Sequence, residues 1–258
     1  MRRVIAAIDS SAAARPVLAV AARVAELLGA ELEALHVADG DEAARVQAEA
    51  VGLRLRIVPG PTVSSLVAAA RPREVVAMVL GARGTPAGRR PAGRTALEVI
   101  TSLRKPLVVV PPEDARRGPV RRLLVPLDGT ATTAAALRGT IEFARGCELD
   151  VVVLHVHDES TLPPFDDHAE HETRSWASEF LRRHCPGPPE ELRLELRVGM
   201  PHDHIVRVAR EADVDLIALG WAQDLSPGRA AVVRETLAKS SVPVLLVPVD
   251  REPLPGLA

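Results

Sequence analysis

The fold is decided by RRVIAAIDSSAAARPVLAVAARVAELLGAELEALHV (residues 2–37), which aligns without a gap with RRLLVPLDGTATTAAALRGTIEFARGCELDVVVLHV (residues 121–156). Asp9 matches Asp128 at an offset of 119 (128 − 9), and both stretches end in the triplet Leu-His-Val. A repeat of this length, well beyond the roughly 20–50 residues of a solenoid unit, indicates two copies of one domain. Differences between the copies therefore become evidence about which copy can bind a ligand.

Within each copy, short runs rich in β-branched residues alternate with longer segments of helical period, a pattern typical of βαβ units and a parallel sheet. In the first copy we expect strands at 3–8, 31–37, 54–58, 75–80 and 107–110, and helices at 13–28, 63–70 and 92–103. In the second copy we expect strands at 122–127, 148–156, 193–198, 216–219 and 244–247, and helices at 132–145, 166–184, 202–212 and 230–239. The sequence thus predicts an α/β fold with two open, parallel, five-stranded sheets and flanking helices.

The segment 111–119 is rich in proline and charge, so we expect it to link a first domain at 1–112 to a second at 120–250. The last strands of the two copies, 107–110 and 244–247, are short aliphatic runs flanked by prolines. Such strands are usually buried by pairing or packing. We therefore expect the two copies to form an intramolecular pseudo-dimer through these strands.

The copies differ most between their second and third strands. His155 and Gly199 are 44 residues apart (199 − 155), whereas His36 and Gly60 are 24 apart (60 − 36). Shortening a surface connection costs little free energy. We expect the first copy to lack most of a helix that the second copy keeps at 166–184.

Composition argues against several classes of function. Of the 258 residues, 47% are hydrophobic but 2% are aromatic, and none is tyrosine, so surfaces that stack single-stranded nucleic acid are scarce. A net charge of −2 gives no electrostatic reason to expect binding to DNA or to an anionic membrane. Two cysteines without framework spacing favour a reducing compartment. We expect no signal peptide and no membrane-spanning segment, and a cytoplasmic protein.

Three features occur in the same order in both copies. The first is a strand ending in Asp and a small or hydroxyl residue (IAAIDSS, VPLDGT), and the second is a strand ending in LHV. The third is a strand, glycine loop, helix and strand, most complete as VLGARGTPAGRRPAGRTALEVITSLRKPLVVVPP in the first copy. Together they resemble the universal stress protein family in its tandem two-domain form, over nearly the entire chain.

The resemblance implies a fold of the adenine-nucleotide α-hydrolase type, and dimers of the family pair in the manner expected here for the two copies. Some members of that family bind ATP, with the Asp after the first strand at the adenine end and a loop G-x2-G-x9-G-[ST] around the phosphates. Other members lack the loop and bind no nucleotide. Ligands of open α/β sheets generally lie beyond the carboxyl ends of the strands, where backbone N–H groups of a glycine loop and a helix N-terminus favour phosphate.

In the first copy, the loop has the form Gly81-x2-Gly84-x8-Gly93-Arg94-Thr95. Its middle spacing is one residue shorter than in the family pattern, and Arg94 stands where the family has Ser or Thr. The resemblance implies an adenine-nucleotide site, possible in the first domain only, with no metal beyond the magnesium that accompanies ATP. Its expected residues are Asp9, Val37, Gly81, Gly84, Gly93, Arg94 and Thr95.

The arginines of this loop have two interpretations. They could attract an anionic ligand, or they could be solvated surface charges; the residues are Arg83, Arg89, Arg90 and Arg94. For Arg94 itself, either its guanidinium replaces the family's hydroxyl as a phosphate contact or it fills the phosphate site as a plug.

In the second copy, the corresponding run is Gly220-Trp-Ala-Gln-Asp-Leu-Ser-Pro-Gly228, followed by Arg-Ala-Ala. The indole of Trp221 and the carboxylate of Asp224 would be poor neighbours for a triphosphate. We expect this copy to have lost nucleotide capacity and to retain Asp128 for the turn after its first strand.

Histidines suggest two further hypotheses. A metal site could be formed by a set that no cysteine completes, and we expect none there: His157, Asp158, His168, His171, His202 and His204. His36 and His155 end strands at matching positions and are expected to be hydrogen-bonded structural residues.

Catalytic motifs are weak. The run from Gly88 to Thr95 is a near match to a Walker A loop, but arginine replaces the lysine and Gly88 lies well past the strand. No G-x-S-x-G elbow follows a strand. Trp176 and Phe180, four residues apart, are most simply a helix packing on the sheet.

The leading hypothesis is a stress-response or regulatory protein that senses an adenine nucleotide in its first domain and acts through protein partners. The first alternative is a nucleotide-free interaction scaffold in which both loops have degenerated. A third hypothesis, ranked last because no base or nucleophile is identified, is an enzyme acting at a nucleotide phosphate. We expect no nucleic-acid or membrane partner, and a homodimer is possible.

Overall fold

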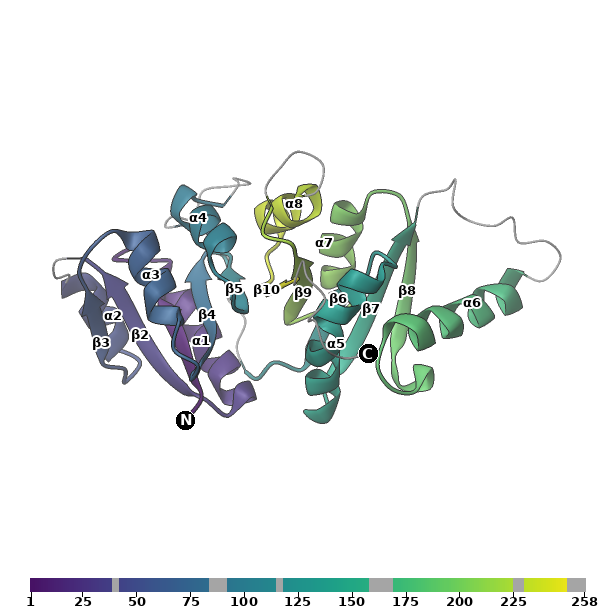
Figure 1. The fold of residues 1–258 in the computed structure, drawn as a ribbon, viewed down its shortest axis with the longest axis horizontal. Helices are drawn as coiled ribbons and strands as arrows, with labels where there is room; N and C mark the ends of the chain where they lie inside the picture. Colours follow the sequence, from purple (N-terminus) through teal and green to yellow (C-terminus); the bar gives the residue numbers. More distant parts are fainter. Residues whose placement is uncertain (39–41, 84–91, 115–117, 158–168, 225–229, 250–258) are drawn as a thin grey trace, which may run out of the picture.

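The two halves of the molecule lie side by side and share one sheet (Figure 1). The structure, a computed structural model, describes residues 1–38, 42–83, 92–114, 118–157, 169–224 and 230–249. In these residues the sheet has ten strands in the order β3-β2-β1-β4-β5-β10-β9-β6-β7-β8. The first five are β1 (Arg3–Ala7), β2 (Glu31–Val37), β3 (Leu55–Val58), β4 (Val75–Gly81) and β5 (Leu107–Val110). The others are β6 (Arg122–Pro126), β7 (Asp150–His157), β8 (Arg193–Val198), β9 (Leu216–Trp221) and β10 (Val244–Pro248).

Each half of the sheet is parallel, and the halves meet at a pair of antiparallel strands. β10 pairs with β5 through Val244 with Val109, Leu245 with Val108 and Leu246 with Leu107. The predicted α/β fold and the pseudo-dimer through the last strands are both confirmed. The two predicted sheets are joined edge to edge by this pair.

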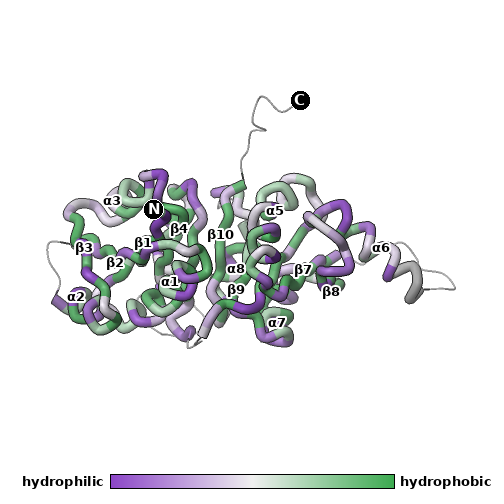
Figure 2. The backbone as a smooth tube through the Cα atoms, turned by 90° about the horizontal axis from the view of Figure 1, so that it is seen from below, coloured by the Kyte–Doolittle hydropathy of each residue, from purple (hydrophilic) through white to green (hydrophobic). Residues whose placement is uncertain are grey.

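Helices cover both faces of the sheet. One face carries α1 (Ala14–Leu28), α2 (Glu42–Glu49), α5 (Ala131–Gly146) and α6 (Ala169–His184). The other carries α3 (Thr62–Ala70), α4 (Arg94–Ser102), α7 (Pro201–Glu211) and α8 (Ala231–Lys239). A short 3₁₀ turn, η2 (Pro189–Glu191), precedes β8. Apolar residues gather on the strands between the two helix layers, and polar residues gather on the outer surfaces of the molecule (Figure 2).

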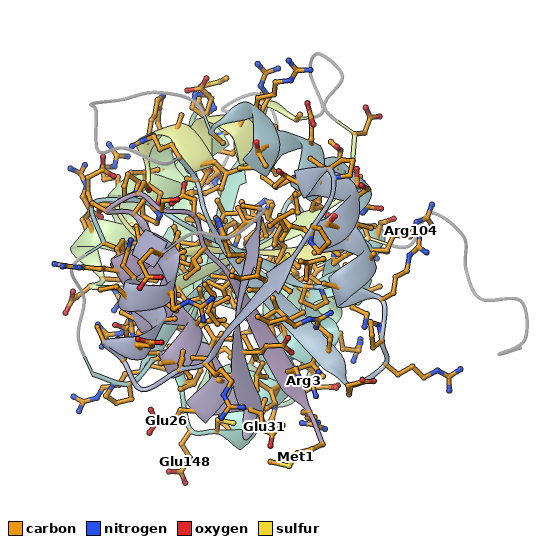
Figure 3. The ribbon with its side chains drawn as sticks, turned by 90° about the vertical axis from the view of Figure 1, so that its left-hand side faces the viewer. Met1, Arg3, Glu26, Glu31, Arg104 and Glu148 are labelled. Atoms are coloured by element: carbon orange, nitrogen blue, oxygen red, sulfur yellow. The ribbon has the colours of Figure 1, made fainter. Side chains whose placement is uncertain are left out.

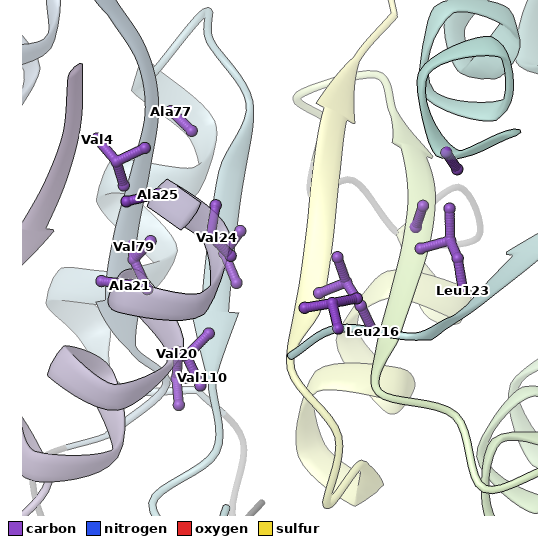
Figure 4. Close-up of a cluster of buried hydrophobic side chains, with 14 of the residues drawn as sticks. Val4, Val20, Ala21, Val24, Ala25, Ala77, Val79, Val110, Leu123 and Leu216 are labelled. Carbon is purple, nitrogen blue, oxygen red and sulfur yellow. The ribbon is translucent and has the colours of Figure 1, made fainter. Parts of the chain in front are cut away.

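The core is aliphatic, as the composition requires. Successive residues of a strand point to opposite faces, so Val4 and Ala6 face α1 while Ile5 faces the other helix layer. On α1, Val20, Ala21 and Val24 are buried at helical spacing (Figure 4). Each fully buried aliphatic side chain contributes about 1.5–3 kcal/mol.

Charged side chains are directed outward, and Glu26, Arg104 and Glu148 project from the periphery (Figure 3). Arg23 is an exception, since its residue is 8% exposed. Its Nη2 lies 3.2 Å from Oδ1 of Asp215 in the other copy. This ion pair joins the two copies on the α1 face of the sheet, in addition to the β5–β10 pairing within the sheet.

The connection between the second and third strands is shorter in the first copy, as predicted, but its helix is not lost to the extent predicted. The first copy keeps a helix of 8 residues, α2, where the second has 16 residues in α6. Our prediction that the first copy lacks most of this helix is wrong, because α2 still buries Ala44 and Ala48 against the core.

Candidate functional site

A cavity of about 370 Å³ lies in the first copy, at the carboxyl ends of the strands. β1 stands between β2 and β4 in the sheet, so the chain order reverses there, which is where open α/β sheets bind ligands. The cavity is bordered by residues of β1, β2 and β4, of helices α1, α3 and α4, and of the adjoining loops. Its volume lies within the roughly 300–1,000 Å³ usual for small-molecule sites.

Asp9 stands at the rim of this cavity and forms a local turn. Its Oδ1 accepts hydrogen bonds from the backbone N–H of Ser11 at 3.0 Å and from the Ser11 hydroxyl at 2.6 Å. Asp128 does the same in the second copy, where its Oδ1 accepts from N–H and hydroxyl of Thr130. The turn function of Asp128 is confirmed, and Asp9 shares it.

The two strand-end histidines also perform one structural task in both copies. Nδ1 of His36 lies 2.8 Å from the carbonyl oxygen of Ile8, and Nδ1 of His155 lies 2.8 Å from that of Leu127. A carbonyl can only accept, so Nδ1 donates in each case. These hydrogen bonds fix the residue before each turn aspartate, as expected for structural histidines.

Helix α4 begins at the cavity wall. Gly93 is its N-cap residue, with φ −61° and ψ 155°, and its N–H donates to the carbonyl oxygen of Ala82 at 2.7 Å. The N–H groups of the first helical turn lack partners within the helix, and the helix dipole favours negative charge there. Since Arg94, Thr95 and Ala96 border the cavity, this turn is suited to an anion.

The side chain of Arg94 lies at the edge of the cavity and extends into solvent. It is 93% exposed, and its Nε donates to Oε1 of Glu98 at 2.7 Å. The hydrogen bond to Glu98 raises the pKa of Arg94 above its ordinary value. The hypothesis that Arg94 plugs the phosphate site is wrong, because an exposed guanidinium fills no cavity.

Arg83 is the arginine held close to the site. It borders the cavity, its side chain is 11% exposed, and its Nη2 lies 3.1 Å from Oε1 and 3.3 Å from Oε2 of Glu113. Sequence analysis counted Arg83 among the loop charges but did not select it. The position directly after Gly81 and Ala82, at the end of a strand, was the available signal.

Six of the seven predicted site residues border the cavity: Asp9, Val37, Gly81, Gly93, Arg94 and Thr95. Gly84 lies outside the described residues, as do Gly88, Arg89 and Arg90. Sequence analysis missed Thr62 and Leu66, which border the cavity from α3. The Gly60-Pro61 pair marks the start of that helix at the same edge of the sheet.

The second copy contains an equivalent cavity of about 680 Å³. Trp221 does not fill it, because the indole N–H donates to the carbonyl oxygen of Ile100 in the first copy at 3.0 Å. Trp221 borders the cavity, as expected from the sequence, and also forms a contact between the copies. Charge does differ: the described residues that border this cavity include Asp128 and Asp224 but no Arg, Lys or His.

The remaining histidines and aromatic residues have other roles. Within the described residues, no three His, Cys, Asp or Glu side chains are grouped as metal ligands would be, and His168 and Asp158 lie outside them. His204 is buried, with Nδ1 2.6 Å from Nη2 of Arg207. Trp176 and Phe180 stack with ring centroids 5.2 Å apart, as expected for a helix packed on the sheet. No helix among the described residues has the length and apolarity needed to cross a membrane.

Comparisons with known proteins agree with this architecture. The family model described as the universal stress protein family matches residues 119–248, half of the 258-residue chain. A functionally unknown protein from Pseudomonas aeruginosa PAO1 superposes with a TM-score of 0.70 at 15% identity, over 97% of this chain and 93% of that one. A universal stress protein from Archaeoglobus fulgidus gives 0.64 at 17% identity, over 96% and 97%. No curated protein matches the chain. These likenesses show the fold, and the family match shows more: the chain belongs to the universal stress protein family, in its tandem two-domain form.

Proposed function

We propose that the first domain, residues 1–112, binds an adenine nucleotide such as ATP in its cavity. The second domain, residues 120–250, binds none and serves as the structural partner of the first. The protein acts as a cytoplasmic stress-response regulator through protein partners, without turnover of the nucleotide. No catalytic residue is assigned.

The observation behind this proposal is the difference in charge between two cavities of common design. The first turn of a helix borders each cavity, α4 in the first copy and α8 in the second, but the first cavity has two arginines, Arg83 and Arg94, beside one carboxylate, Asp9. The second is larger, but the charged residues described along it are Asp128 and Asp224. A triphosphate is favoured by cations and helix N-termini and repelled by carboxylates. Room for a ligand exists in both copies, and electrostatics favours an anion in the first.

The proposed site divides into an adenine end and a phosphate end. Asp9 and Val37 would lie at the adenine end, on the rim formed by β1 and β2. Gly81, Gly84, Gly93, Arg94 and Thr95 would surround the phosphates, with backbone N–H groups as donors. Magnesium would arrive with the nucleotide and would be held mainly by phosphate oxygens.

The test is to purify the full chain and to identify any co-purified nucleotide by mass spectrometry, followed by calorimetric titration with ATP and adenosine. We expect one ATP per chain, with adenosine weaker because it lacks the phosphates. Binding of two ATP molecules per chain would contradict the assignment to one domain. Steady release of phosphate or pyrophosphate would favour an enzyme instead.

A nucleotide-free scaffold remains the second candidate, and one observation favours it. The side chain of Arg94, at the family's hydroxyl position, is turned outward and paired with Glu98. Absence of ATP binding in the titration, together with retention of the folded state, would support the scaffold. In that case the tandem architecture itself would be the functional feature.

A further inference from the structure

Glu113 is the acidic partner of Arg83, the partly buried arginine at the cavity of the first copy. It follows β5 in the linker between the two domains, three residues beyond Val110. Both carboxylate oxygens lie within 3.3 Å of Nη2 of Arg83. The two side chains differ in exposure, at 11% for Arg83 and 42% for Glu113. The arginine is held by its surroundings, whereas the carboxylate is the half of the pair that solvent reaches.

The backbone around Arg83 is fixed by hydrogen bonds to both flanking elements. The N–H of Ala82 donates to the carbonyl oxygen of Val110 at 2.8 Å, and the carbonyl oxygen of Ala82 accepts from Gly93 at 2.7 Å. These bonds connect the end of β4 to the end of β5 and to the start of α4. Arg83 therefore stands where the glycine loop, the phosphate end of the cavity and the linker meet.

A phosphate group offers a guanidinium the same interaction as a carboxylate. Arginine binds both through paired N–H donors, so the two anions compete for one fork. Because the Glu113 carboxylate is 42% exposed, solvent weakens the ion pair and an incoming phosphate can replace it. The second copy has Ala222 at this position (83 + 139, the offset of Gly81 and Gly220) and thus no equivalent pair.

We propose that Glu113 is a built-in competitor for the phosphates of the ligand. It binds Arg83 while the cavity is empty, and the ligand displaces it when Arg83 turns to a phosphate. Displacement breaks the ion pair that holds Glu113, so binding of a ligand in the first domain changes the contacts of the linker between the domains. This inference rests on the proposed nucleotide binding and assigns Arg83 as its specificity-determining cation.

The experiment is a titration of four variants with ATP, adenosine and inorganic tripolyphosphate: wild type, Glu113→Gln, Arg83→Ala and the double variant. Glu113→Gln should raise the affinity for ATP and tripolyphosphate by up to about fivefold, the upper end for an exposed pair, and leave adenosine unchanged. Arg83→Ala should weaken ATP by about tenfold or more, as expected for loss of a hydrogen bond between charged groups. In the Arg83→Ala background, Glu113→Gln should have no further effect.

Glu98→Gln is the matched control, because Glu98 is an exposed carboxylate paired with another arginine at the same cavity. It should leave the ATP affinity within about twofold of wild type, since Arg94 points outward. If Glu98→Gln and Glu113→Gln raised the affinity for ATP equally, the effect would come from the net charge of the protein, and the inference would be overturned. ATP binding that Glu113→Gln leaves unchanged would overturn it while the proposed function stands. Failure of all variants to bind ATP and tripolyphosphate would overturn both.

Discussion

The two copies have the same frame and different chemistry. In both, an aspartate closes the turn after the first strand, and a histidine at the end of the second strand bonds to the carbonyl before that turn. These residues serve the backbone, whose geometry is the same in each copy. At the end of the fourth strand the copies differ, with Ala82-Arg83 in the first and Trp221-Ala222 in the second. One copy presents a cation to its cavity, and the other sends an indole to its neighbour.

The largest effect is expected from Trp221, which the second copy uses to hold the first. Its residue is 3% exposed and its indole donates to Ile100. Trp221→Ala should destabilise the protein by about 3–5 kcal/mol, since truncation of a buried Trp leaves a cavity. Calorimetric unfolding should show this as a lower Tm, with separate transitions for the two domains if they come apart.

Trp221→Phe is the control, because it retains most of the packing and removes only the hydrogen bond. Its cost should be nearer 1 kcal/mol. A Tm for Trp221→Ala equal to that of wild type would show that the indole contributes nothing to the contact between copies.

Gly93 should distinguish the copies by ligand binding. A Cβ at Gly93 would meet the carbonyl oxygen of Ala82 at 3.5 Å, an ordinary contact, so the fold should accept a side chain. Gly93→Val should place branched carbons where the phosphates are proposed and weaken ATP by at least about tenfold, with little change in Tm.

The equivalent N-cap residue of α8 is Ala230, and Ala230→Val gives the matched measurement in the second copy. Its residue is 1% exposed, so some loss of stability is expected. ATP affinity should be unaffected where the variant is folded. Greater loss of ATP binding from Ala230→Val than from Gly93→Val would place the nucleotide in the wrong copy for our proposal.

The architecture followed from the sequence because it depends on repeated, local signals. Strand and helix periods and the proline-flanked aliphatic strands each specify an element or an edge. The directions of long polar or bulky side chains could not be predicted in this way. Trp221 and Arg94 border their cavities as their sequence positions suggested, but their hydrogen-bond partners, Ile100 and Glu98, could not be predicted from those positions.

The second copy has a cluster of histidines and aromatic residues on β7 and α6. His155, His157 and His184 gather around Trp176 and Phe180, with neighbouring ring centroids 4.5–5.9 Å apart. Burial, then the charge of His155, lowers the pKa of His157. The pKa of His184 is lowered mainly by burial and further by the charges of Arg183 and His155. The carboxylate of Asp128 acts in the opposite direction and raises it.

These pKa shifts give stability a direction in pH. The folded state favours neutral imidazoles, while the unfolded chain takes up protons near the ordinary value of about 6.5. The stabilisation is complete above that value and is lost as pH falls through the lower pKa values of the folded state. We expect the Tm to fall as the pH is lowered from above about 6.5 to below it. A His157→Gln, His184→Gln double variant should flatten this dependence; an unchanged slope would remove the cluster as its source.

The smallest expected effect comes from one pair of positions at the ends of matching helices. Gly29 and Glu148 (29 + 119) both follow the first helix of their copy, and both have φ 57°. Glycine adopts this left-handed conformation freely, whereas a residue with a Cβ is disfavoured by about 1 kcal/mol. The side chain of Glu148 projects into solvent (Figure 3), so its removal should leave the packing intact.

Glu148→Gly should therefore stabilise the protein by up to about 1 kcal/mol, or about 2–4 °C in Tm. Gly29→Ala should lower the Tm by a similar amount, because the first copy then acquires the strain that the second already contains. If Glu148→Gly lowered the Tm instead, the greater backbone freedom of glycine in the unfolded chain would outweigh the relief of strain. The sign of this one change thus measures how far the second copy's backbone departs from what its own sequence prefers.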